Sequence, residues 1–376
     1  MKKINLLILV VMFVLVGCGE QSSHYIYSET TADLDIEKNT IIDATYDENE
    51  NSDTQLKLGD YIEMGNYLGE NILWRCVSFE KIKGYDKNGN PVMDATDTAT
   101  EYKEGYLPLM LSDKILCFKA FDAFGDNTVG SHGRGYKEFR QISDINNIIR
   151  SRSGGSNYWG DSNIRDWLNS DKDSGNVIWS CGNPPDREHV VSDEYSDESG
   201  FLTNFNSQEK TLIQKVTQKS IIPPYEYSEE VKENLFKHNF YIETSVQNYD
   251  VADSEMCEDR IFLLDVKQVN TVYKSFDNYY KEAEATSGAL INGHETREHK
   301  YFSYTLRTPY TCATAWKYLN NVRWIVPNPG DYAGNVRFVD SSIAAGIRPA
   351  FFLNESANGI FKMGLGTEVE PYRLSW

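Results

Sequence analysis

Residues Asp259 to Asn270, D-R-I-F-L-L-D-V-K-Q-V-N, predict an abrupt change from strand to helix. The continuous apolar run Ile261–Leu264 is typical of a short buried strand. Asp265 and Gln268 then have the spacing of a capping box, and apolar residues recur at helical intervals as far as Tyr273. A buried strand that leads directly into an amphipathic helix is therefore the first feature we expect.

Outward from this segment, the chain is predicted to form strands, then helices, then strands again. Apolar and β-branched runs predict strands before it, at Asp60–Met64, Ile72–Phe79, Pro108–Ser112 and Ile115–Phe118. Further strands are predicted after it, at Phe302–Leu306, Val322–Val326, Val336–Val339 and Gly346–Leu353. This order favours an α+β domain over a sheet of alternating βαβ units.

Two more helices are predicted between the two groups of strands. Gly160–Asp171 has capping-box spacing at Asn163 and Asp166, followed by apolar residues on one face. Phe205–Ser220 begins with the same spacing at Asn206. We therefore expect two to three helices with long loops among antiparallel sheets.

The N-terminus predicts the location of the protein. Lys2 and Lys3 precede the apolar run Ile4–Val16, which is too short for a spanning helix of about 20 residues. The stretch ends Leu-Val-Gly-Cys, and this matches the box at which bacterial lipoproteins are cut and acylated, here on Cys18. We expect a signal peptide over residues 1–18 and a lipid anchor, such as palmitate, on the extracytoplasmic face of the cell membrane. An uncleaved anchor and an ordinary secretory signal are the alternatives.

Residues 19–56 are predicted to form a disordered tether. They carry ten acidic side chains and a single basic one, Lys38, and few apolar residues. Flexible-chain scaling gives this tether a span of about 35 Å. A single α+β globular domain is expected over residues 57–376.

Charge and motifs exclude several function classes. The chain has 37 Lys and Arg against 56 Asp and Glu, a net charge of −19, which argues against nucleic acid as a partner. The tether alone carries 1 − 10 = −9 of this charge. The sequence has neither a P-loop nor a clean G-x-G-x-x-G after a strand, so nucleotide cofactors are not expected.

Metal and cofactor motifs are weak. Asp86, Asn88 and Asn90 have calcium-loop spacing, but Pro91 stands where the loop needs Gly, and a β-turn explains the same residues. His294 and His299 are five residues apart rather than the four of H-E-x-x-H, which favours a solvated loop. We therefore expect no cofactor and no metal site, with calcium as the minor alternative.

Cysteines and acid pairs leave catalysis without a strong candidate. Cys76 and Cys117 lie in apolar strands and are predicted to be buried thiols, whereas Cys257 could pair with Cys181 or Cys312. Asp161 and Asp166 would serve a glycosidase only if they faced each other across a cleft, and a helix start favours acids anyway. No residue is assigned a catalytic role.

Eight motifs occur in an order that resembles a family of bacterial extracellular domains of unknown function, family 6273. Together they span about 300 residues, so the match is specific as a set. The motifs are GDYIEMGNY (59–67), ILWRCV (72–77), MLSDKIL (110–116), NYWGDSNIRDWLN (157–169), GFLTNF (200–205), DRIFLLDVKQVN (259–270), YFSYTLRTP (301–309) and GIRPAFFLN (346–354). The family has no established activity, so the resemblance implies a fold and no reaction.

The closing motifs L-R-T-P, V-x-x-V-D and G-I-R-P-A also resemble C-type-lectin-like and formylglycine-generating-enzyme-like domains. This resemblance implies a short Arg-bearing C-terminal strand that closes a looped antiparallel sheet over two helices. Formylglycine-generating enzymes use a pair of cysteines late in the chain, whereas Cys312 has Cys257 as its nearest neighbour. The oxidase activity is therefore not implied.

The candidate ligand-binding residues are loop aromatics and family-matched arginines. Tyr158 and Trp159 lie in S-N-Y-W-G-D, and Asp331 and Tyr332 lie in N-P-G-D-Y, where rings could stack on a ligand or fill the core. The matched arginines, Arg165, Arg307 and Arg348, either pair with buried carboxylates or contact the ligand; of these, Arg307 and Arg348 are the ligand-binding candidates.

The function favoured by the sequence is a surface-anchored, non-enzymatic module that binds a glycan, a wall polymer or a protein. An extracytoplasmic enzyme, either a formylglycine-type oxidase or a hydrolase, and a structural or adhesive domain without a small ligand are the alternatives.

Overall fold

The computed structural model describes ten stretches of the chain. They are residues 56–123, 155–180, 183–191, 193–223, 246–292, 300–310, 321–325, 336–340, 343–354 and 361–374, with the backbone alone at 292, 321–325, 336–340 and 361–362. Cys18, residues 19–55 of the predicted tether, His294, His299, Asp331 and Tyr332 lie outside these stretches, whereas Leu56, the last residue of that prediction, is buried in the core. Within them, no helix is long and apolar enough to cross a membrane.

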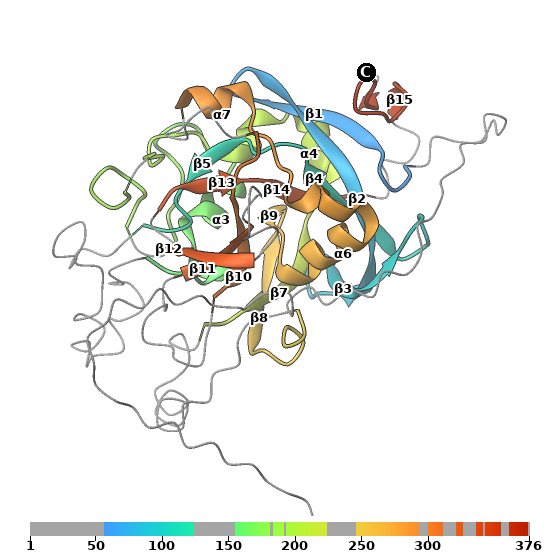
Figure 1. Ribbon diagram of the computed structural model, residues 1–376, viewed down its shortest axis with the longest axis horizontal. Coiled ribbons are helices and arrows are strands. Elements are labelled where there is room, and N and C mark those ends of the chain that lie inside the picture. The colour runs from blue at the N-terminus through green and yellow to red at the C-terminus, as the bar shows by residue number, and fades with distance from the viewer. Residues whose placement is uncertain are drawn as a thin grey trace, which may run out of the picture.

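The described elements form a mixed α+β fold with many strands and few helices (Figure 1). The strands are β1 (Tyr61–Tyr67), β2 (Glu70–Tyr85), β3 (Pro91–Ala99), β4 (Tyr106–Ser112), β5 (Cys117–Lys119), β6 (Ile213–Gln214), β7 (Val216–Ile221), β8 (Ser254–Asp259), β9 (Ile261–Leu263), β10 (Tyr304–Pro309), β11 (Asn321–Ile325), β12 (Val336–Asp340), β13 (Ala345–Ile347), β14 (Pro349–Leu353), β15 (Phe361–Met363) and β16 (Arg373–Leu374). The α-helices are α3 (Asn163–Leu168), α4 (Ser207–Leu212), α6 (Val266–Phe276) and α7 (Ser287–Asn292), with 3-10 helices η2 (Trp159–Asp161), η3 (Phe201–Asn204) and η5 (Asp277–Tyr280).

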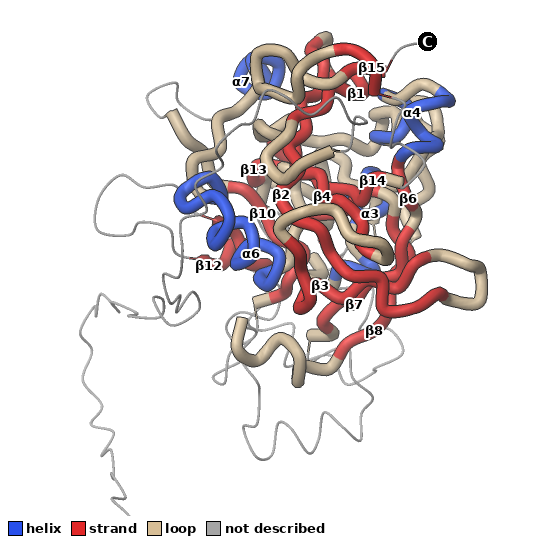
Figure 2. Tube along the Cα trace, turned by 90° about the vertical axis from the view of Figure 1, so that its right-hand side faces the viewer, coloured by secondary structure: helices blue, strands red, loops and turns tan. Residues whose placement is uncertain are grey.

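Two main sheets organise the fold. The nine-stranded sheet has the order β6-β14-β4-β2-β3-β7-β8, with β1 added to β2 and β9 added to β14. The five-stranded sheet has the order β12-β11-β10-β13-β5, and β15 and β16 form a small hairpin. All pairs are antiparallel except β3 with β7 and β10 with β13. The long strand β2 pairs with three neighbours and has register shifts, which bend the sheet around the core (Figure 2).

Among the described elements the chain crosses between the two sheets four times, and Arg348 lies where two of these crossings meet. Strands β13 and β14 belong to different sheets and are separated only by Arg348, while β4 passes into β5 through the turn after Ser112. The Arg348 side chain donates to the backbone carbonyls of Ser112 (2.9 Å), Asp113 (3.1 Å) and Tyr279 (3.2 Å). One fully buried guanidinium therefore holds both crossings together.

The segment β9–α6 confirms the predicted change from strand to helix. Asp265 caps α6 by accepting from the Gln268 backbone N–H at 2.8 Å, and the Gln268 side chain accepts from Asp265 in return. Val266, Val269 and Val272 are fully buried, so α6 packs its apolar face onto β2 and β3.

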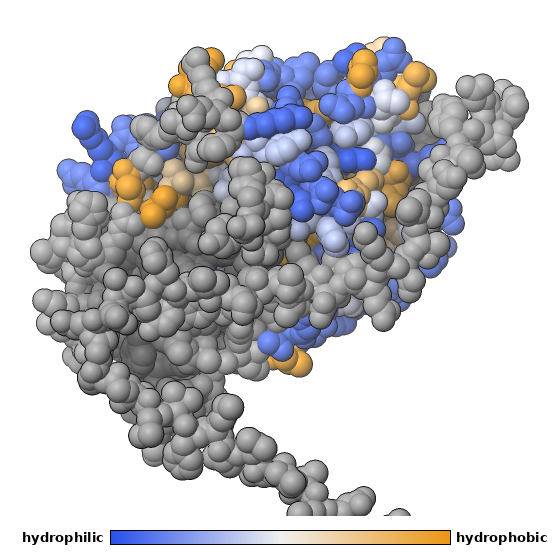
Figure 3. All heavy atoms as spheres, viewed as in Figure 1, coloured by the Kyte–Doolittle hydropathy of each residue, from blue (hydrophilic) through white to orange (hydrophobic). Residues whose placement is uncertain are grey.

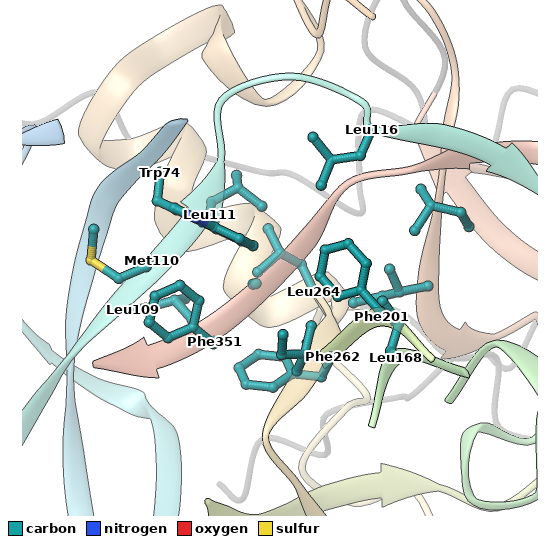
Figure 4. Packing of buried hydrophobic residues seen from close by; sticks show 14 of the residues in the cluster. Trp74, Leu109, Met110, Leu111, Leu116, Leu168, Phe201, Phe262, Leu264 and Phe351 are labelled. Atoms are coloured by element: carbon teal, nitrogen blue, oxygen red, sulfur yellow. The ribbon is translucent and has the colours of Figure 1, made fainter. Parts of the chain in front are cut away.

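Aromatic and aliphatic side chains from both ends of the chain form one core (Figure 4). Trp74 meets Phe351 edge to face, with ring centroids 4.8 Å apart, and donates its indole N–H to the Met64 carbonyl. Trp74, Trp159 and Trp167 are all completely buried. On the face of the molecule shown in Figure 3, hydrophilic side chains cover most of the described surface, and hydrophobic ones lie in small groups.

Two predicted helices differ from the observed ones. The predicted helix Phe205–Ser220 ends at Leu212, because Val216–Ile221 forms β7 and pairs with β3 and β8; the Asn206 capping box is confirmed. The predicted Asn163 cap is wrong, since Ser162 caps α3 by accepting from the Arg165 backbone N–H.

Two further differences concern the strands and the Asn163 side chain. Asn163 Oδ1 accepts from the Ala123 backbone N–H at 2.7 Å instead of capping α3. Strand β3 (Pro91–Ala99) was not predicted, because only Pro91 and Met93 are buried and its second half is rich in Asp and Thr.

Candidate functional site

Three of the predicted ligand-contacting residues gather on one face of β7 and β8. The antiparallel register places Gln218 opposite Cys257 and Val216 opposite Asp259. The 3-10 helix η2, which carries Trp159, and β10, which carries Arg307, both pack against β7. We call this group of buried polar side chains, together with Tyr158 beside η2, the polar cluster.

Asp259 is one centre of the polar cluster. Its carboxylate accepts from Trp159 Nε1 (2.8 Å), Arg165 Nε (2.6 Å) and Gln218 Nε2 (3.2 Å), and it is completely buried. Arg165 also donates to the Gly160 carbonyl at 3.0 Å. The salt bridge and the indole hydrogen bond thus fix η2 and α3 onto the end of β8.

Arg307 is the second centre. Its guanidinium forms a salt bridge with Asp265 and donates to Gln268 Oε1 (2.7 Å) and to the Leu263 carbonyl (2.9 Å). Tyr249 Oη donates to the same Asp265 carboxylate at 2.8 Å. Arg307 therefore connects β10 to the end of β9 and to the cap of α6.

Glu80 adds a third carboxyl group to this interior. It is completely buried, and the Gln268 side-chain amide donates to both of its oxygens at 3.3 Å. Burial and the neighbouring Asp265 raise the pKa of Glu80 to about 8. Glu80 is therefore uncharged at neutral pH, and the remaining charges of the cluster form two internal pairs.

The Cys257 thiol lies beside the pair formed by Asp259 and Arg165. Burial, followed by the charge of Asp259, raises its pKa, and the neighbouring Arg165, Tyr158 and Ser220 do not reverse this. A thiol kept protonated in this way is a weak nucleophile. Cys76, Cys117 and Cys257 are free and buried, while Cys181 and Cys312 lie outside the described residues.

Some polar atoms of the cluster are left without partners. Among the buried side-chain atoms of the described residues, Gln218 Oε1, Ser220 Oγ and Arg307 Nε have no hydrogen-bond partner. The Cys257 thiol lies beside Ser220, but a thiol is only a weak hydrogen-bonding group. An unpaired buried polar atom costs about 1–3 kcal/mol, so such atoms call for an explanation.

The face that carries these atoms opens toward the surface at one end. Ser220 lies opposite Glu255 in the β7–β8 register, and Glu255 is exposed. The Tyr158 side chain is buried, but its hydroxyl donates to Glu255 Oε2 at 2.8 Å. Tyr158 therefore stands between the unpartnered side chains and the exposed end of β8.

The other predicted site residues are placed as follows. Trp159 and Arg307 are buried inside the cluster, and Arg348 lies at the joint between the sheets. Arg165 and Arg307 pair with carboxylates, whereas Arg348 donates to backbone carbonyls. Their contact with a ligand stays a prediction, as does that of Asp331 and Tyr332.

The residues with calcium-loop spacing, Asp86, Asn88 and Asn90, form a hairpin turn between β2 and β3. Asp86 Oδ1 accepts from the backbone N–H groups of Asn88 (2.7 Å) and Asn90 (2.9 Å), and Oδ2 accepts from Thr217 Oγ1 (2.6 Å). Asp97, in the strand that follows this turn, pairs with Lys81 at 2.7 Å. No group of three or more metal-ligating side chains occurs in the part of the chain that the structure describes.

Asp161 and Asp166, the acid pair considered above for a glycosidase, have no hydrogen-bond partner in common within the described structure. The Asp166 carboxylate accepts from the backbone N–H of Ser180 at 2.6 Å, and Asp161 ends η2. Asp161 therefore lies in η2 and Asp166 in the next helix, α3.

A family model described as "Domain of unknown function (DUF6273)" matches residues 139–355, more than half of the chain. The chain belongs to the DUF6273 family. Comparisons with curated proteins and with solved structures return no match. The DUF6273 range contains Asp259, Arg307 and Arg348, but β1 to β5 precede it. Because β4 pairs with β14, these earlier strands complete a sheet of the DUF6273 region.

Sequence reasoning missed Glu80, Gln218, Ser220 and the pairing role of Asp259. The sequence did carry a signal for them, namely polar residues within apolar or β-branched runs. Such residues are costly to bury without a partner, so their presence indicates buried hydrogen bonds or ion pairs. Gln218 and Ser220 were missed because the segment Phe205–Ser220 was predicted as one helix, whereas both residues lie in strand β7.

Proposed function

We propose that this DUF6273 protein is a lipid-anchored extracytoplasmic module that binds a polyhydroxylated ligand, a glycan or wall polymer, without catalysing a reaction on it. The sequence Leu15–Cys18 supports the anchor, and the acidic residues 19–56 would serve as its tether. The bent antiparallel-rich sheet, the few helices and the short strand that follows Arg348 support a C-type-lectin-like fold.

One observation carries the binding proposal. Gln218 Oε1 and Ser220 Oγ are neutral hydrogen-bonding atoms that have no partner, and they lie on one strand beside the exposed end of β8. Hydroxyl groups both donate and accept, so a sugar hydroxyl can satisfy either atom. The ligand would replace the hydrogen bond between Tyr158 and Glu255 to reach them.

The charges favour binding over catalysis. Asp259 with Arg165 and Asp265 with Arg307 form internal pairs, and the pKa of the Cys257 thiol is raised. A general acid or nucleophile needs a group poised for proton transfer or attack, whereas these pairs hold the surrounding strands in place.

The test is a screen of the full chain against glycan and wall-fragment arrays, with and without calcium. Ser220→Ala should weaken binding about 2- to 10-fold, the range expected for one neutral hydrogen bond. The same variant should fold at least as stably as the wild type, because it removes an unpaired buried hydroxyl. An improved stability with weaker binding would separate a binding role from a structural one.

Ser162→Ala is the matched control. Ser162 is also completely buried, but it caps α3, so its loss should lower stability by about 1 kcal/mol and leave binding unchanged. The proposal fails if no array ligand binds the wild type, or if Ser220→Ala binds as well as the wild type does.

A further inference from the structure

Arg75 extends from β2 into a group of aromatic rings at the end of α6. Its guanidinium carbon lies 4.0 Å from the ring centre of Phe276, 4.5 Å from that of Tyr279 and 5.3 Å from that of Tyr61. Phe276 ends α6 and Tyr279 belongs to η5, so these two elements hold the guanidinium on the outer face of β1 and β2. Figures 1 and 2 place β1 at the opposite end of the molecule from β7 and β8.

Among the described residues, the Arg75 guanidinium has no hydrogen-bond acceptor in contact with its buried Nε. No described side chain forms a hydrogen bond or ion pair with the guanidinium. The residue is partly exposed, so solvent reaches the site. Cation–π contact orients a guanidinium and stabilises its charge, but it occupies none of the five N–H groups.

A second unused donor lies next to Arg75. Tyr61 faces Arg75 directly in the β1–β2 register, and within the described structure its hydroxyl forms no hydrogen bond. Burial, with the charge of Asp113, raises the pKa of Tyr61 to about 12, so the hydroxyl keeps its proton at neutral pH. The site therefore offers a fixed guanidinium and a phenolic O–H.

Two carboxylates, those of Asp113 and Glu368, and a second guanidinium lie near this site. Asp113 accepts from Tyr279 Oη at 2.9 Å, and Glu368 is exposed. Arg348 stacks over the same Tyr279 ring at 4.5 Å and adds positive charge. Asp277, between the two rings that enclose Arg75, has a left-handed φ of 48°, a strained backbone of the kind often found at functional sites.

We propose that Arg75 and Tyr61 form a binding site for an oxyanion, the carboxylate or phosphate group of a saccharide or other small ligand. The Arg75 guanidinium can only donate, and the protonated Tyr61 hydroxyl can donate beside it, so a group that accepts through several oxygens is complementary to the pair. A carboxylate or phosphate matches the planar fork of a guanidinium. The site is separate from the polar cluster and does not depend on the function proposed above.

Calorimetric titration of the full chain with glucuronate and with glucose 6-phosphate tests this site, and neutral glucose serves as the matched ligand. Saturable binding of either acid by about 10 mM, with none of glucose, is the expected result. The acid that binds more tightly identifies the group as a carboxylate or a phosphate. Absence of saturable binding for both acids overturns the proposal.

Variants locate the binding. Arg75→Gln should weaken it at least about 10-fold, and Arg75→Lys, which keeps the charge but loses the fork, should weaken it less. Tyr61→Phe keeps the ring and should cost about 2- to 10-fold. Arg373→Gln removes a charge from the exposed Arg373–Glu63 pair and should leave binding within about 2-fold.

Each variant is first compared with the wild type by near-ultraviolet circular dichroism, so that a loss of binding is scored only in folded protein. If Arg75→Gln fails to fold, Arg75→Lys and Tyr61→Phe decide the question. Unchanged affinity in the folded variants at position 75 overturns the proposal. Binding that Ser220→Ala abolishes and Arg75→Gln preserves would assign the oxyanion to the polar cluster and also overturn it.

Discussion

Arg307 and Asp265 form a salt bridge inside the protein, and only 3% and 2% of their side chains are exposed. The pair joins β10 of the smaller sheet to the first residue of the α6 cap. Its partners Gln268 and Tyr249 satisfy further donors and acceptors around it. The pair therefore connects elements that lie more than 40 residues apart in the chain.

Arg307→Met should destabilise the protein by about 3–5 kcal/mol, because it leaves the Asp265 carboxylate buried without its cation. Chemical denaturation at pH 7 measures the change. Arg373→Met, which removes a cation from an exposed pair with Glu63, is the control and should change stability little. A small effect of Arg307→Met would mean that Asp265 is neutral or hydrated in the folded protein.

Glu80 should make stability depend on pH. Its pKa rises from 4.5 in the unfolded chain to about 8 in the folded protein. Between these values the folded state retains a proton that the unfolded state has lost, so stability falls as pH rises, by up to about 1.4 kcal/mol per pH unit. The stability that Glu80 contributes to the folded protein is fully present below pH 4.5, and it is lost as the pH rises through about 8.

Glu80→Gln tests this dependence, because the amide stays neutral at every pH. We expect the difference in unfolding free energy between variant and wild type to grow in favour of the variant from pH 5 to about pH 8, and then to level off. Denaturation series at several pH values give the two curves. Parallel curves across that window would contradict the raised pKa of Glu80.

Gly65→Ala should destabilise the protein more than Gly69→Ala does. Both glycines have positive φ, +80° and +82°, so both variants bear a backbone strain of about 1 kcal/mol. A Cβ at Gly65 would also lie 2.6 Å from the Phe205 ring, whereas one at Gly69 meets nothing within 4 Å. The clash should add about 1–3 kcal/mol, measured as the difference between the two variants.

Asp86→Ala should lower the melting temperature, while added calcium or a chelator should not change that of the wild type. The Asp86 carboxylate accepts from Thr217, Asn90 and Asn88, and these hydrogen bonds hold its pKa well below the usual range. Thr217→Val removes one donor and should reproduce part of the effect. A large increase in melting temperature with calcium would instead indicate a metal site at this turn.

Much of the fold could be predicted where local signals and tertiary packing agree. The run Ile261–Leu264 is apolar throughout and the capping box at Asp265 is specific, so the structure has β9 and α6 where we predicted them. The turn at Asp86–Asn90 was predictable for the same reason, since its hydrogen bonds form within five residues.

The candidate site could be predicted only in part. Trp159 and Arg307 were singled out, but their pairing with Asp259 and Asp265 was not predicted, because hydrogen bonds and salt bridges join residues whose separation in the chain carries no signal. Arg75 was recognised only as part of a motif, since the rings around it come from α6 and η5, about 200 residues further on.

The sequence by itself determined the local elements: the α6 cap, the β2–β3 turn, the apolar strands, and the lipoprotein-like N-terminus that predicts an anchor. Tertiary structure alone decided the state of Val216–Ile221. Its residues permit a helix, but pairing along its length with β8, and at Thr217 with β3, supplies partners for the backbone groups of a buried strand. The same holds for the arginines, because burial requires a partner for each charge, and only the folded chain brings Asp259 to Arg165 and Asp265 to Arg307.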